Sequence, residues 1–227
     1  LVLDDALAAL GGGRAAIATR YPRPGWAEQD PRAWEAAIGV AIAAALAEAG
    51  LPAAAISALA ITGQLDGMVA VDGDGAPLSP CLPWLDRRAA LPPLDPDRLL
   101  TLAGQVADAS HLAAKARHWD RHGGGPRAAG FHAPVSYLVE RVTGARVIDP
   151  SQASTTMLLH LEDGAWSAEL AAAFELDVAR LPRIAPAGAR AGVVTAVGAA
   201  LTGLARAVYE ACAPGGRRRG RGRGRRT

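Results

Sequence analysis

Residues 56–88 read ISALAITGQLDGMVAVDGDGAPLSPCLPWLDRR and alternate short apolar runs with polar turns. The run at 56–62 predicts a buried core strand, and the polar residues at 63–67 predict a loop after it. The segment 68–78 predicts a second strand that ends in an Asp-Gly turn, and prolines break 79–89 into a loop. The stretch therefore predicts the centre of an α/β domain with a mixed sheet.

A helix is expected upstream of this stretch, over residues 31–49. Asp30 can accept hydrogen bonds from the free N–H groups of a first helical turn, and Pro31 suits the first helical position. Apolar residues then recur at helical spacing until Gly50, which is a stop signal.

The rest of the chain alternates in the same way, which is typical of α/β domains. Short strands are expected at 1–3 and 14–21, around a Gly-rich turn. Residues 147–167 are expected to be extended with a turn, and 181–195 to be a Pro/Gly-rich connection. Further helices are expected at 96–102, 111–122, 134–144, 167–176 and 196–211.

Composition limits the class of protein. The 227 residues are 50% hydrophobic and 20% charged, and no run of 18 uncharged apolar residues predicts a membrane span. Asp4 and Asp5 stand where a secretory signal would be basic. Cys81 and Cys212 have no metal-ligand spacing, so a reduced cytoplasmic protein is expected.

The net charge of +2 is unevenly distributed. The segment 217–227 holds seven arginines and no acid, which leaves 17 basic against 22 acidic residues, or −5, in the rest of the chain. An acidic body argues against a nucleic-acid-binding domain, because phosphate neutralisation needs a basic face.

His118 and His122 have the i, i+4 spacing that could place two metal ligands on one helix face. The sequence has neither an HExxH pattern nor an evident third ligand, so a solvated helix face is favoured.

Six segments taken in order resemble the N-terminal half of the FGGY family of carbohydrate kinases, the xylulokinase-like branch in particular. They are GWAEQDPRAW, ITGQLDGMVAVDGDGAPLSPCLPWLDRR, YLVERVTG, DPSQASTTMLL, GAWSAEL and LPRIAPAGARAGVVT. The resemblance implies a ribonuclease-H-like, actin-related α/β fold. It also implies transfer of the ATP γ-phosphoryl group to a sugar or polyol hydroxyl, with Mg²⁺ and a carboxylate base.

The same resemblance implies a substrate site. GQLDG matches a family loop that reaches the substrate, so Gln64 and Asp66 would hydrogen-bond sugar hydroxyls. WLDRR matches W-x-D-x-R: Trp84 would face the sugar's C–H groups, Asp86 would bind a hydroxyl, and Arg88 would orient Asp86 or the substrate. The alternatives are a polar turn and a buried tryptophan with a surface ion pair. Trp26, Glu28 and Asp30 match a signature interpreted as structural.

The sequence also departs from the family. Many xylulokinases carry Met-His where this chain has Leu65-Asp66, so another ketose or a polyol such as erythritol is possible. The family's first D-x-G-T loop, its Gly-Gly-x-Asp stretch with the catalytic base, and its ATP domain have no counterpart here. No catalytic residue is therefore assigned, and an incomplete, inactive fragment is expected.

Two units are expected: a sugar-binding domain at 1–205, and a disordered Arg/Gly-rich tail at 206–227 that is not native family sequence. A shifted reading frame would explain the tail, and an RNA-binding segment is the alternative. The competing function for the chain is a non-catalytic sugar-binding or partner-binding module, and a homodimer is possible.

Overall fold

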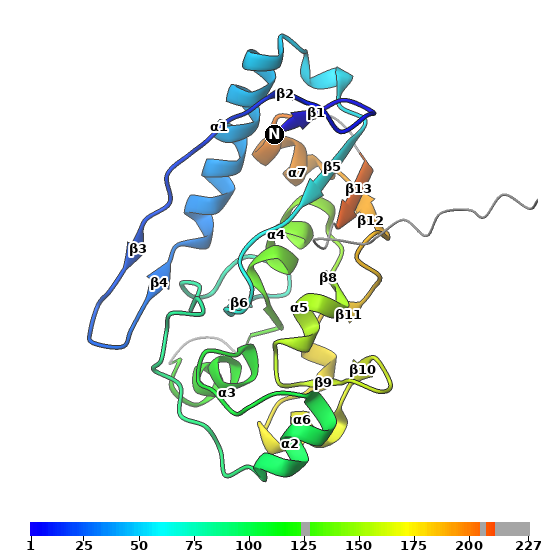
Figure 1. The fold of residues 1–227 in the computed structure, drawn as a ribbon. Coiled ribbons are helices and arrows are strands. Elements are labelled where there is room, and N and C mark those ends of the chain that lie inside the picture. The colour runs from blue at the N-terminus through cyan, green and yellow to red at the C-terminus, as the bar shows by residue number, and fades with distance from the viewer. Residues whose placement is uncertain (124–127, 205–207, 212–227) are drawn as a thin grey trace, which may run out of the picture.

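The computed structural model describes residues 1–123, 128–204 and 208–211. Of the tail predicted at 206–227, residues 206–207 and 212–227 lie outside these ranges. Figure 1 shows an elongated molecule with α1 (Pro31–Ala49), α7 (Ala196–Thr202) and a three-stranded sheet towards one end. Helices α2 (Pro96–Ala103), α3 (Leu112–His122) and α6 (Ala168–Ala173) lie towards the other.

Helix α1 confirms its predicted bounds and caps. The Asp30 carboxylate accepts from Arg32 N, Pro31 occupies the first turn, and Gly50 ends the helix at φ 65°. Its buried face carries Trp34 and Glu35. The Glu35 carboxylate accepts from the Tyr137 hydroxyl and, at 2.7 Å, from Arg141 Nε, and so it joins α1 to α4 (Pro134–Thr143).

Helix α4 lies at the centre of the half of the molecule that contains α1 and α7, which is the upper half in Figure 1. It contacts α7, β8 (Val147–Ile148) and the three-stranded sheet, in which β12 (Arg190–Val193) pairs antiparallel with β13 (Val208–Ala211). β13 in turn pairs parallel with β5 (Ala58–Ile61), so the sheet is mixed, as predicted. Apolar side chains of α4 fill the space between these elements; they include Val135, Val139 and Val142.

A second apolar cluster fills the lower half, between α2, α3 and α6. Its largest buried side chains are Met68, Leu99, Leu112, Phe131, Met157, Leu158 and Phe174. The remaining short elements are η1 (Ala53–Ala55), α5 (Pro150–Ser154), β9 (Leu159–His160), β10 (Ala165–Trp166), η2 (Val178–Arg180) and β11 (Arg183–Ile184). β9 pairs with β10, and β8 pairs in parallel with β11.

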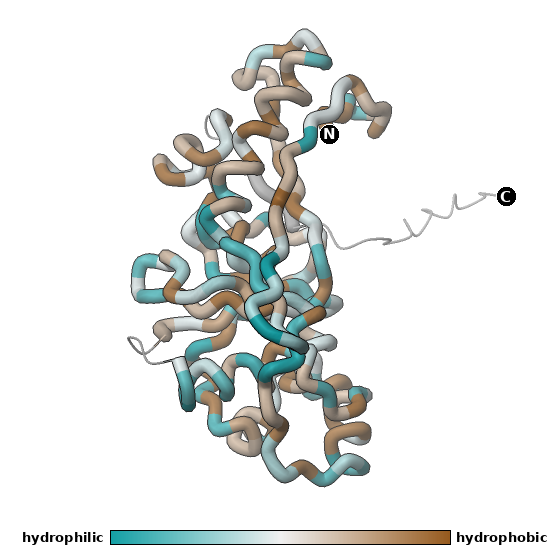
Figure 2. Tube along the Cα trace, turned by 90° about the vertical axis from the view of Figure 1, so that its left-hand side faces the viewer, coloured by the Kyte–Doolittle hydropathy of each residue, from teal (hydrophilic) through white to brown (hydrophobic). Residues whose placement is uncertain are grey.

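An antiparallel ladder crosses the middle of the molecule. β3 (Thr19–Arg20) pairs with β4 (Glu28–Gln29), and Gln29 then pairs with Cys81. The ladder continues from Leu82 to Met68, and from β6 (Val69–Val71) to β7 (Gly130–His132). Hydrophilic residues follow the β3–β4 hairpin on the side facing the viewer in Figure 2. This ladder joins the predicted loops 63–67 and 79–89.

Several sequence-based expectations need correction. The core strand is confirmed over 58–61, but its predicted burial is only partial, because Ala58 and Ala60 are exposed and the opposite face packs on α4. Residues 150–154, expected to be extended, form α5, because the Asp149 carboxylate caps its first turn.

Strand pairing explains the other corrections. The expected connection 181–195 contains β11 and β12, and the expected helix 196–211 ends at Gly203 and is followed by β13. At the N-terminus, β1 (Val2–Leu3) pairs with β2 (Ala9–Gly11), while the strand expected over 14–21 shrinks to β3. Each of these strands depends on a partner that local sequence patterns do not identify.

Helix α7 fits between α1 and α4 only because small residues face it. A Cβ at Gly198 would lie 2.2 Å from Val142 O, and a Cβ at Gly39 would lie 2.5 Å from Leu201 O. Real Cβ atoms do not approach backbone that closely, so the two helix contacts require glycine.

We expect Gly198→Ala to lower the free energy of unfolding by about 1–3 kcal/mol, because the backbone of α4 must shift. This loss should exceed the roughly 1 kcal/mol that alanine gains over glycine in a helix. Urea denaturation would measure it, with Gly188→Ala as the control, since a Cβ at Gly188 meets nothing within 4 Å. Equal stability of the two variants would contradict the close contact.

Candidate functional site

Two loops leave the ladder at the same end. Met68 N donates to Leu82 O and Leu82 N donates to Met68 O, both at 3.0 Å. The pair is antiparallel, so the loop that precedes Met68 and the loop that follows Leu82 start side by side. Gly67 allows this approach at φ 102°, where a Cβ would lie 3.3 Å from Leu82 O. The predicted residues Gln64 and Asp66 thus share one region with Trp84.

Asp86 and Arg88 form a buried assembly with the β3–β4 hairpin. The Asp86 carboxylate, 0% exposed, accepts from Ala27 N and from Arg88 Nε, each at 2.8 Å. Arg88 also donates to Glu28 Oε1 at 2.9 Å, and its guanidinium carbon lies 3.7 Å from the centre of the Trp26 ring. Trp26 and Glu28 therefore act as structural partners of the W-x-D-x-R segment.

Gln64 and Trp84 lie nearer the surface. Gln64 Nε2 donates to Gln29 Oε1 at 3.0 Å, and Gln29 Nε2 donates to Thr19 Oγ1 at 2.9 Å, so this amide is oriented by the hairpin. Trp84 is 49% exposed, which leaves part of its ring available for contact.

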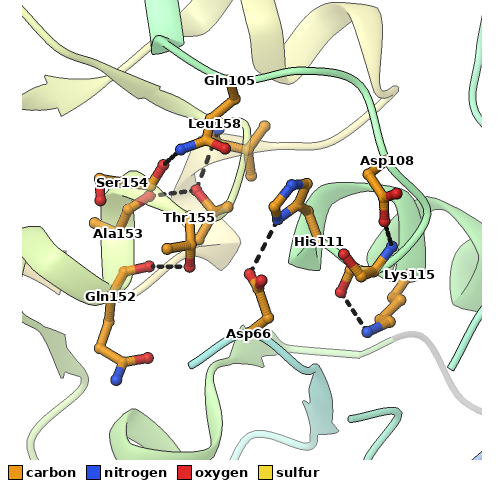
Figure 3. A network of polar contacts seen from close by, with 12 residues as sticks. Asp66, Gln105, Asp108, His111, Lys115, Gln152, Ala153, Ser154, Thr155 and Leu158 are labelled. Carbon is orange, nitrogen blue, oxygen red and sulfur yellow. Dashed lines mark hydrogen bonds and ion pairs between the residues drawn. The ribbon is translucent and has the colours of Figure 1, made fainter. Parts of the chain in front are cut away.

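Asp66 pairs with a residue from another element. Its Oδ1 lies 3.1 Å from Nδ1 of His111, the residue that precedes α3. The side chains are 15% and 14% exposed, so the pair is only partly open to solvent, and Figure 3 shows the Asp66 carboxylate facing the His111 ring. Asp66 adopts φ 57°, a left-handed conformation that is uncommon for residues other than glycine and that Asp and Asn tolerate best.

Lys115 lies behind this pair. Its Nζ donates to Ser110 O and, at 2.6 Å, to Pro83 O, so one ammonium ties the loop before Trp84 to the residue before His111. The side chain is fully buried, and burial lowers the pKa of Lys115 to about 8, against the opposing effects of Cys81, Asp86 and Asp66. Burial likewise raises the pKa of the Cys81 thiol to about 12.

Three residues of this region were missed by the sequence reasoning. Lys115 is the only lysine among the 227 residues, and that rarity is a signal that could have singled it out. His111 gave no comparable signal, because its partner Asp66 is 45 residues away. Gln152 of α5 is buried, and its Oε1 has no hydrogen-bond partner in the described part of the chain.

The structure also bears on the other candidates. The rings of His118 and His122 stack with centroids 4.7 Å apart, and within the described residues no group of three or more His, Cys, Asp or Glu side chains could hold a metal ion. An open hollow of about 470 Å³ is lined by Leu85 and residues 21–26 rather than by Asp66. None of the described helices is long and apolar enough to cross a membrane.

The family follows from a match that covers most of the chain. Residues 1–213 match the N-terminal domain of the FGGY family of carbohydrate kinases. The chain belongs to this family. Its fold is accordingly the ribonuclease-H-like ATPase domain expected from the sequence, and the family match includes residues beyond 205.

Curated FGGY relatives similar to this chain include glycerol kinases. The chain is 36% identical over 190 residues to the glycerol kinase of Delftia acidovorans, an alignment of 76% of this chain and 38% of that protein. It is 35% identical over 208 residues to that of Bordetella pertussis, covering 85% and 41%. The chain therefore spans about two fifths of the length of these relatives.

Among solved structures, FGGY kinases share the fold. A xyloylose kinase of Brucella ovis superposes with a TM-score of 0.82 at 27% identity, over 93% of this chain and 45% of that one. The xylulose kinase of Rhodospirillum rubrum gives 0.77 at 27% identity, over 87% and 43%.

We expect Arg88→Met to destabilise the chain by about 3–5 kcal/mol, because it leaves the Asp86 carboxylate buried without its charged partner. Chemical denaturation would measure the loss. Arg87→Met is the matched control, since Arg87 pairs with Asp108 on the surface and such pairs contribute about 0–1 kcal/mol. Similar losses in both variants would contradict the assigned role of Arg88.

The pKa of Lys115 predicts a pH dependence. Between about 8 and 10.5, the folded chain has released a proton that the unfolded chain still holds. The contribution of Lys115 to the free energy of unfolding therefore rises with pH across this window.

We expect Lys115→Met to destabilise the chain by about 1–3 kcal/mol near neutral pH, because two backbone carbonyls lose their donor. The difference in unfolding free energy between wild type and variant should then grow as pH rises through the window. Urea unfolding from about pH 7 to about pH 11 would test this, and a constant difference would show that Lys115 stays charged.

Proposed function

We propose that this chain supplies the substrate-binding wall of an ATP-dependent kinase that phosphorylates a hydroxyl of a ketose or polyol. The observation that carries the proposal is the convergence of the Asp66 loop and the Trp84 loop at one end of the ladder. Family membership and the similarity to glycerol and xylulose kinases support it.

The roles divide according to exposure. Gln64 and Asp66 offer polar atoms at the surface, and the half-exposed Trp84 offers an apolar ring face for C–H groups. Asp86 and Arg88 are buried against the hairpin, which supports a role in holding the Trp84 loop beneath the substrate. Such positioning is a large part of catalysis in phosphoryl transfer.

The FGGY family implies ATP and a divalent metal as co-reactants. Within the described residues no cluster of acidic, His or Cys side chains fits a metal ion, so no step of the proposal runs through either group. What this chain's own residues contribute is the orientation of the acceptor hydroxyl.

The proposal is tested by binding. Glycerol and D-xylulose would be titrated into the 227-residue chain and followed by ligand-observed NMR. Saturable binding of at least one of them is expected, and binding of neither would overturn the proposal.

We expect Asp66→Asn to weaken that binding about 10- to 100-fold, because a hydrogen bond to a charged group is worth about 1.5–3 kcal/mol. Asn tolerates the left-handed backbone as Asp does, so the substitution removes charge without adding strain. Asp74→Asn, in an exposed turn, is the control and should bind as wild type. Unchanged affinity in Asp66→Asn would remove Asp66 from the site.

A further inference from the structure

The contact between Asp66 and His111 determines which atom of the imidazole donates to the carboxylate. Nδ1 lies 3.1 Å from a carboxylate oxygen, which can only accept, so Nδ1 must carry the hydrogen. In the neutral ring, Nε2 is then a bare acceptor. His111 directly precedes α3, but its side chain makes no hydrogen bond to the first turn of the helix. The hydrogen bond of the ring is therefore the one to Asp66.

Three acceptor atoms in this region remain open. Gln64 uses its Nε2 on Gln29, which leaves its Oε1, and Asp66 uses Oδ1 on His111, which leaves its Oδ2. His111 Nε2 is the third. Within the described residues none of these atoms has a protein partner, and none belongs to the fully buried unpaired atoms, so each is open to solvent.

We propose that His111 is a specificity-determining residue of the site, and that its Nε2 accepts a hydrogen bond from a substrate hydroxyl beside the one bound by Asp66. Resting on the proposed function, this narrows the substrate class to compounds that carry two neighbouring hydroxyls. Two neighbouring acceptors match two O–H donors, whereas a carbonyl oxygen or a carboxylate would face them without a hydrogen bond.

Charged groups from several segments of the chain surround the ring. Asp66 lies against Nδ1, Lys115 lies one turn along α3, and Asp108 lies in the loop before α3, where Arg87 pairs with it. Figure 3 shows His111 between Asp66 and Asp108, with residues 152–155 of the α5 segment on the opposite side of Asp66.

The test uses glycerol and dihydroxyacetone, which differ only in the central carbon: one carries a hydroxyl, the other a carbonyl. Wild type should prefer glycerol. His111→Asn can keep a donor near the Nδ1 position for Asp66 but has no atom at Nε2. It should reduce the preference about 3- to 10-fold, the value of one hydrogen bond. His111→Gln, which can place an amide oxygen near Nε2, should restore part of it.

Controls separate this inference from the proposed function. His122→Asn, on the exposed end of α3, should leave both affinities unchanged. If Asp66→Asn weakens glycerol binding while His111→Asn keeps the wild-type preference, His111 only positions Asp66 and the inference is wrong. If wild type binds neither compound, the proposed function and this inference fail together.

A measurement on the wild-type chain covers the case in which the variants do not fold. Long-range ¹H–¹⁵N NMR of histidine-labelled protein should show the Nδ1–H tautomer for the neutral ring of His111. The signal of its Nε2 should shift when glycerol is added. An Nε2–H tautomer of His111, or an unchanged Nε2 signal of His111 when glycerol is bound, would overturn the proposal.

Discussion

The buried pair of Asp86 and Arg88 is the constraint on which the site depends. A carboxylate without solvent contact is tolerated only when charge and hydrogen bonds replace its water, and here Arg88 Nε and the backbone N–H groups of Ala27 and Arg88 do so. Ala27 lies 59 residues before Asp86 in the sequence. Satisfying one carboxylate therefore fixes the β3–β4 hairpin against the Trp84 loop.

Lys115 performs a related task on the other side of the same loop. Its ammonium donates to two backbone carbonyls, those of Pro83 and Ser110, and so holds the Trp84 loop beside the start of α3. All other Lys and Arg positions of the chain are arginine, but a planar guanidinium at this position would need more space and more acceptors than the compact ammonium. The Trp84 loop is thus held from opposite sides by two buried cations, Arg88 and Lys115.

These buried contacts support the surface groups that the proposed function assigns to the substrate. Asp66 and His111 satisfy each other through one atom each and keep another atom open, and Gln64 does the same through Gln29. Rigid support beneath a few open polar atoms is the arrangement expected of a site that orients hydroxyl groups.

The sequence by itself determined the local features. Asp30, Pro31 and Gly50 define α1 because caps act within one turn, and the loops 63–67 and 79–89 follow from glycine and proline positions. The resemblance carried by these loops gave the family and the residues Gln64, Asp66, Trp84, Asp86 and Arg88.

Only the tertiary structure decided which of these residues meet. The pairing of β12 with β13, and of β13 with β5, joins segments that no local pattern connects. The partners of Asp66 and Asp86 are likewise set by chain crossings, as is the burial of Lys115. A sequence pattern specifies which atoms a side chain offers, whereas the folded chain alone decides which of them are used internally and which stay open to a substrate.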